Sequence, residues 1–129
     1  MCSFGKAIAA ASQAGKFKLD RWAYGPFAYR PSYRTIAEGL YSMSFSHDFL
    51  SKSELKALRA ITFGRLPRSM PRLNRLASKL IDVYHNTVEE DPELEKDLRP
   101  LLVLIAWLYP YIDSEVAEKI GWRLVLEAL

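Results

Sequence analysis

The sequence predicts an all-α fold: a single domain, residues 1–129, that forms a compact bundle of about five or six helices. Helix-start signals recur at Ser51, Ser69, Asp91 and Asp113, and apolar residues at helical spacing follow them. No segment shows convincing strand alternation. Half of the residues are hydrophobic, and a chain of this length can bury a core without disulfides.

Residues 1–31 are expected to form a peripheral helix and an aromatic connection, and residues 32–129 the bundle. The alanine-rich segment from Phe4 to Ala14 favours a short helix. Gly15 is placed to end this helix, as glycine often does. The segment from Lys16 to Pro31 contains Gly25, Pro26 and Pro31 and is typical of an irregular connection.

The bundle is expected to begin with a helix from about Ser32 to Phe45, because Ile36, Leu40 and Met43 have the i, i+4, i+7 spacing of one helix face. This apolar spacing is typical of a face that packs on a core. Gly39 lies inside the segment and weakens the prediction, because glycine disfavours helix interiors.

The next helix has the clearest start. Ser51 and Glu54 form an S-x-x-E capping box, in which each side chain binds the other residue's backbone N–H. Leu50 and Leu55 flank the box at the positions of a hydrophobic staple. The helix is expected to run to about Gly64.

A longer helix should follow from Ser69 to about Asn86, with Pro71 tolerated in its first turn. His85 would then lie near its C-terminal end, where a histidine favours the helix dipole. Leu73, Leu76, Leu80 and Tyr84 share one face, and that face is expected to be buried.

Three prolines and two aspartates mark the remaining boundaries. Asp91-Pro92 has the pattern of a cap followed by a first-turn proline. Pro100 should kink or restart the helix, and Pro110 should end it. A final helix should begin at Asp113 and reach nearly to Leu129.

The longest apolar run, Leu101 to Ile112, has 12 residues, whereas a membrane-spanning helix needs about 20. It is expected to be a buried core helix, so no membrane association is predicted. Cys2 is the only cysteine, which excludes an intrachain disulfide. With no secretory signal at the N-terminus, these features favour a cytoplasmic protein.

Catalytic and metal-binding signatures are missing from the sequence. His47, His85 and Cys2 have no recognisable partners for nucleophilic catalysis. No metal-ligand motif or glycine-rich nucleotide loop occurs. The acidic run from Glu89 to Asp91 is typical of a solvated turn. We therefore expect no enzyme activity, no cofactor and no metal.

The net charge of +3 hides an uneven distribution: residues 1–88 carry 14 basic and 5 acidic side chains (+9), and residues 89–129 carry 4 and 10 (−6). Such asymmetry is typical of a basic surface that meets an acidic partner, often nucleic acid. The alternative is that an acidic helix packs beside a basic one. The sequence leaves both readings open.

Four cations define what we call the basic ridge: Arg68, Arg72, Arg75 and Lys79. Their spacing of four, three and four places them within about 60° of one another on a helix, away from the leucine face. We expect them to point outward and to contact phosphates. A solvated amphipathic face is the simpler alternative. The full set of nucleic-acid-binding candidates is Lys52, Lys56, Arg59, Arg65, Arg68, Arg72, Arg75 and Lys79.

The segment from Arg21 to Arg34 interleaves arginines with aromatic residues. Such a mixture can stack on unpaired bases, anchor a protein interface, or simply cover the core. The candidates for stacking or partner binding are Arg21, Trp22, Tyr24, Tyr29, Arg30, Tyr33 and Arg34.

Two stretches, Phe49 to Arg59 and Asp97 to Tyr109, resemble the small helical subunit of multisubunit CRISPR effector complexes (Cascade-like or type III). The first is similar to the Ser-x-Leu-Arg helix starts of that family, and the second to its apolar helix after an acidic loop. The resemblance implies a helical, catalytically inert subunit that contacts nucleic acid in a ribonucleoprotein for antiviral defence. The segment before Tyr33 has no counterpart in it.

Three functions are therefore weighed. The first is a non-catalytic subunit of a ribonucleoprotein, with DNA or RNA, other subunits and copies of itself as partners. The second is a small inhibitor or adaptor that binds an acidic protein. The third is a helix-turn-helix regulator, with Arg72 and Arg75 at the start of the recognition helix and Asn74 as the main base reader.

Overall fold

The computed structural model describes residues 3–14, 33–45, 49–121 and 123–124. These residues contain helices and no strand, which confirms the all-α prediction. The α-helices are α1 (Ser3–Gln13), α3 (Tyr33–Ser44), α4 (Lys52–Thr62), α5 (Met70–Glu90), α6 (Arg99–Leu108) and α7 (Ser114–Ile120). Three short 3-10 helices join them: η2 (Pro92–Leu94), η3 (Lys96–Leu98) and η4 (Tyr109–Tyr111).

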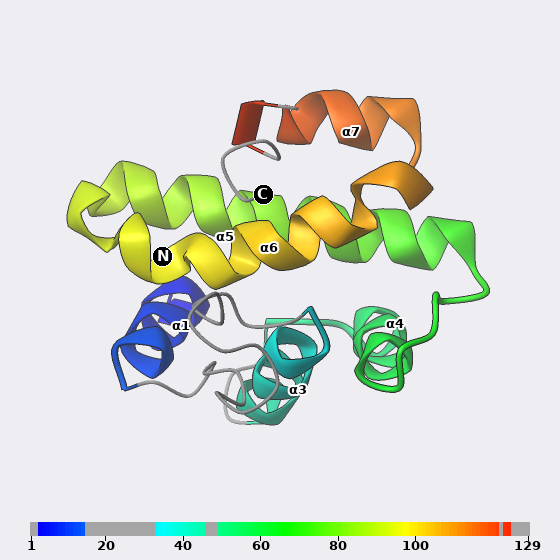
Figure 1. Cartoon of the computed structure of the whole chain (residues 1–129), viewed down its shortest axis with the longest axis horizontal. Coiled ribbons are helices and arrows are strands. Elements are labelled where there is room, and N and C mark those ends of the chain that lie inside the picture. Colours follow the sequence, from blue (N-terminus) through cyan, green and yellow to red (C-terminus); the bar gives the residue numbers. More distant parts are fainter. Residues whose placement is uncertain (1–2, 15–32, 46–48, 122, 125–129) are drawn as a thin grey trace, which may run out of the picture.

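Helices α5 and α6 form an antiparallel pair in the middle of the molecule (Figure 1). On one side of this pair lie α1, α3 and α4, and on the other lies α7. Helix α5 contacts α1, α4, α6 and α7, so it connects helices on both sides of the central pair. Helix α3 packs against α4 and α6.

The core is built mainly from α5 and α6. Leu73, Leu76 and Leu80 of α5 are at most 1% exposed, as their shared helix face predicts. Helix α1 also contributes to the core, because Phe4 and Ile8 are buried one turn apart. The structure thus makes α1 part of the bundle, where the sequence predicts a peripheral helix.

Helix α1 approaches α5 most closely at Gly5. A Cβ atom at this position would collide with the side chain of Thr87. Thr87 is fully buried, and its Oγ1 has no hydrogen-bond partner among the described residues. Glycine is therefore required where these two helices meet.

The predicted helix starts at Ser51 and Ser69 are confirmed. Ser51 Oγ accepts from the Glu54 N–H at 3.3 Å, and Glu54 Oε2 accepts from the Ser51 N–H at 3.2 Å, which completes the capping box of α4. Ser69 Oγ accepts from the Arg72 N–H at the start of α5, and Pro71 lies in the first turn.

Helix α5 is longer than predicted, since it extends to Glu90. Asp91 therefore ends α5, through its N–H bound to the Thr87 carbonyl oxygen. Helix η2 follows with Pro92 in its first turn, as the Asp91-Pro92 pattern predicts, but the Asp91 side chain makes no cap hydrogen bond. His85 is consequently not in the last turn of α5. Pro100 lies in the first turn of α6, as predicted for a helix that restarts.

The final helix is interrupted at Gly121, whereas the sequence predicts one helix that reaches nearly to Leu129; residues 125–129 lie outside the described residues. Helix α7 ends at Ile120, because Gly121 adopts a φ of 80°, a conformation that favours glycine and stops a helix. Its first residue follows Asp113, as predicted, but the Asp113 side chain makes no cap hydrogen bond within α7. Pro110 lies in η4, just after the end of α6.

Candidate nucleic-acid interface

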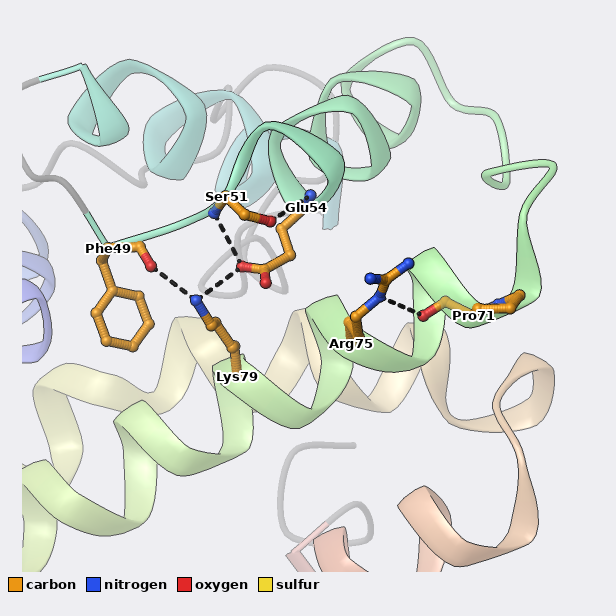
Figure 2. A network of polar contacts seen from close by, with 6 residues as sticks. All are labelled: Phe49, Ser51, Glu54, Pro71, Arg75 and Lys79. Atoms are coloured by element: carbon orange, nitrogen blue, oxygen red, sulfur yellow. Dashed lines mark hydrogen bonds and ion pairs between the residues drawn. The ribbon is translucent and has the colours of Figure 1, made fainter.

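Lys79, the last residue of the basic ridge, is bound to neighbouring residues of the fold, although its side chain is 38% exposed (Figure 2). Its Nζ lies 3.2 Å from Glu54 Oε2 and donates to the Phe49 carbonyl oxygen at 2.9 Å. The same ammonium group lies 5.2 Å from the centre of the Phe49 ring, a distance typical of a cation–π contact. Lys79 thus joins α5 to α4, through Glu54, and to Phe49, which lies three residues before α4.

Glu54 is the acidic centre of this contact. Its side chain is only 5% exposed, and it binds both the Ser51 N–H and the Lys79 ammonium. A buried carboxylate is stable only with such partners. Glu54 is also the only acidic residue between Lys52 and Lys79, so the capping box and the helix-helix ion pair depend on one side chain.

The expectation that the whole basic ridge points outward is wrong for Lys79 and Arg72. The Arg72 Nε donates to Ser53 Oγ of α4 at 3.2 Å, and Arg72 is half-buried. Arg68 lies before α5, which begins at Met70, so the prediction that it shares a helix face with the other three cations is wrong. Arg72, Arg75 and Lys79 do lie on α5, and α4 packs against this helix. Arg68 and Arg75 are exposed, and the Arg75 Nε donates to the Pro71 carbonyl oxygen (Figure 2).

Replacing Lys79 with Ala should therefore destabilise the protein, by about 1–3 kcal/mol, because Glu54 would remain buried with one partner fewer. Urea denaturation measures the loss. Lys79→Met, which keeps the apolar stem but not the charge, should lose a similar amount. A Lys79→Ala protein of unchanged stability but weaker nucleic-acid binding would restore Lys79 to the binding surface.

The remaining cations form what we call the α4 basic surface: Lys52, Lys56 and Arg59 on α4, and Arg65 and Arg68 in the connection to α5. All five are exposed. None of them forms an ion pair with an acidic side chain of the described residues. This surface can therefore accept the charge of an anionic partner.

Three acidic residues, Asp82, Glu89 and Glu90, lie away from the α4 basic surface. Glu89 and Glu90 end α5, whose 21 residues separate them from the α4–α5 connection by about 30 Å. Asp82 pairs with Lys119 of α7 at 2.7 Å, and α7 lies on the other side of α5 from α4 (Figure 1). Glu89 and Glu90 are thus far from the α4 basic surface, whereas Asp113 lies near the start of α5, where it binds Asn74.

Asn74 is used within the fold. Its Nδ2 donates to Asp113 Oδ2 at 2.7 Å, and its Oδ1 accepts from the Asp113 N–H at 2.9 Å. The amide therefore holds the start of α7. This use of both amide atoms counts against Asn74 as a base reader and against α5 as a recognition helix.

Most of the arginine- and aromatic-rich segment lies outside the described residues: Arg21, Trp22, Tyr24, Tyr29 and Arg30. The two described members contact the bundle. Tyr33 stacks on Trp107 of α6, with 4.0 Å between ring centres. The exposed guanidinium of Arg34 lies 3.4 Å from the Thr62 carbonyl oxygen, to which it donates at the end of α4.

Exposed apolar side chains beside the α4 basic surface were missed by the sequence interpretation. Phe63 is 61% exposed, Leu66 39% and Met70 45%. The available signal was the spacing of Phe63, which lies four residues after Arg59 and so continues the helical register of the α4 cations.

Other kinds of site have little support in the described part of the chain. It holds no group of three or more His, Cys, Asp or Glu side chains that could bind a metal ion. None of the helices described has both the length and the apolar character that a membrane crossing requires. Comparison of the chain with known protein families, curated proteins and solved structures finds no match.

Proposed function

We propose that this chain is a non-catalytic, nucleic-acid-binding subunit of a larger ribonucleoprotein complex, with the α4 basic surface as its contact to the phosphate backbone. One observation carries the proposal: five exposed cations lie on one helix and the connection after it, and no described acidic side chain neutralises them. Lysine and arginine at such positions bind phosphates and release counterions.

The other parts of the proposal rest on the sequence. The resemblance of Phe49 to Arg59 and Asp97 to Tyr109 to CRISPR small subunits favours a cytoplasmic complex for antiviral defence. In such a complex the chain would contact other subunits, including copies of itself. Purification from native lysate, with and without nuclease, tests this membership: nucleic acid and the partner subunits should co-purify, and nuclease should remove the former.

Lys56→Ala tests the binding surface. The slope of log affinity against log salt should fall by about 0.7 for a single strand and about 0.9 for a duplex, because one phosphate contact is lost. Fluorescence anisotropy with labelled oligonucleotides measures this slope, both for the isolated chain and for the purified complex. The matched control is Lys96→Ala, which removes an exposed lysine of η3 from the acidic part of the chain. Equal slopes for the wild type and Lys56→Ala in both settings would contradict the proposal.

The second candidate function is a protein-interaction module, an inhibitor or adaptor that binds an acidic protein. The exposed side chains of Phe63, Leu66 and Met70 favour it, because apolar residues bordered by arginine are common in protein interfaces. This candidate predicts weak nucleic-acid affinity at physiological salt and a co-purifying protein that resists nuclease.

A further inference from the structure

Phe63 is an exposed aromatic ring on a well-fixed backbone. It follows the last residue of α4, and 61% of its surface is exposed. The Phe63 N–H binds the Ala60 carbonyl oxygen at 3.1 Å, and the Gly64 N–H binds that of Ile61 at 2.9 Å. The Arg65 N–H also binds the Ala60 carbonyl, at 3.0 Å. The backbone that carries the ring is therefore held by the helix end.

The ring continues the row of cations on α4. At 100° per residue, Lys56, Arg59 and Phe63 lie about 40°, −20° and 20° from Lys52 around the helix axis. All four are exposed. A ligand that lies along Lys52, Lys56 and Arg59 would thus meet the ring of Phe63 at the end of the helix.

Burial of exposed aromatic surface is favourable, so a ligand that lies along the cation row would gain affinity by covering the ring of Phe63. The cations around Phe63 meet no described acidic side chain, and Arg65 and Arg68 follow it in the chain. Proteins that bind single strands combine these two features, cations along the backbone and aromatic rings under the bases. In a duplex the base faces are already stacked on one another.

We propose that Phe63 stacks on an unpaired base, and that the α4 basic surface therefore takes single-stranded nucleic acid rather than duplex. This inference deepens the proposed function and rests on it. The phosphates lie along the α4 cations, and one base lies against the ring of Phe63.

The test compares four substitutions of Phe63 on three probes: a single strand, the same strand with abasic positions, and a duplex. Phe63→Ala and Phe63→Leu should weaken binding to the single strand by about tenfold, the order expected for one stacked base. Phe63→Tyr and Phe63→Trp should bind normally, because they keep an aromatic face. Affinity for the abasic strand and the duplex should not change, and the salt slope should stay the same for all variants. Phe45→Ala is the matched control, because Phe45 is 73% exposed but lies after α3, outside the row.

The possible outcomes separate the two proposals. Normal binding by Phe63→Leu, or equal losses on the intact and abasic strands, would overturn base stacking and leave the phosphate contacts in place. A salt slope that does not respond to Lys56→Ala would instead overturn the proposed function. If Phe63→Ala binds oligonucleotides normally but loses a protein that co-purifies with the wild type, Phe63 is an anchor for that protein and the inference is wrong.

Discussion

Leu76→Ala should lower the free energy of unfolding by about 2–5 kcal/mol. Leu76 is 0% exposed and lies on α5, the helix that contacts α1, α4, α6 and α7. Because helices lie on both sides of α5, the neighbours can close only part of the cavity that the substitution leaves. A typical domain has about 5–15 kcal/mol of stability in total, so this single change should remove a large share of it.

The matched control is Arg75→Ala, one residue earlier on the exposed side of α5. Surface changes of this kind usually alter stability by about 0.5 kcal/mol or less. Urea denaturation followed by circular dichroism compares the two variants. If Leu76→Ala and Arg75→Ala are equally stable, α5 does not form the core described above.

The helix starts could be predicted because their signals are local. Ser51 and Glu54 are three residues apart, and the capping box needs nothing else. Helix ends depend on more distant contacts. Asp91-Pro92 does precede the start of η2, but α5 continues to Glu90, beyond its predicted end near Asn86, and uses the Asp91 N–H for its last turn. Thr87, in that turn, is packed against Gly5 of α1. These two residues are 82 positions apart in the sequence, so no local sequence pattern could indicate their contact.

The candidate binding surface could also be predicted only in part, because helical periodicity is a local signal. Periodicity correctly places Arg72 and Lys79 on one face of α5, but it cannot show which helix lies beside that face. In the fold, α4 lies beside that face: Ser53 of α4 accepts a hydrogen bond from Arg72, and Glu54 of α4 pairs with Lys79. The cations of α4 itself remain exposed, so the centre of the candidate site moves from α5 to α4.

Phe63 was missed because a single phenylalanine near the end of a helix is most often buried. Its exposure depends on the turn after α4, in which Gly64 has a φ of 73° and the chain leaves the helix. Tyr33 gives the opposite case. Its arginine- and aromatic-rich surroundings suggested a partner surface, but its ring stacks on Trp107. Exposure of an aromatic residue is a property of the tertiary fold.

The triple variant Lys52→Ala/Lys56→Ala/Arg59→Ala should have the largest effect on binding. Three phosphate contacts account for about two units of the salt slope on a single strand. If the wild type and the variant bind equally near 1 M salt, this slope difference corresponds to about a hundredfold weaker affinity near 0.1 M. Salt titration by fluorescence anisotropy measures both quantities.

This loss should not come from unfolding. All three side chains are exposed, alanine has the highest helix propensity, and the substitutions remove repulsion between Lys52 and Lys56, which are four residues apart. Stability should therefore stay the same or rise by a few tenths of a kcal/mol. The matched control is Lys6→Ala/Lys96→Ala/Arg99→Ala, which removes three exposed cations outside the α4 basic surface. Both triple variants have the same net charge, so equal losses of slope would show that binding follows total charge and would contradict a specific contact at α4.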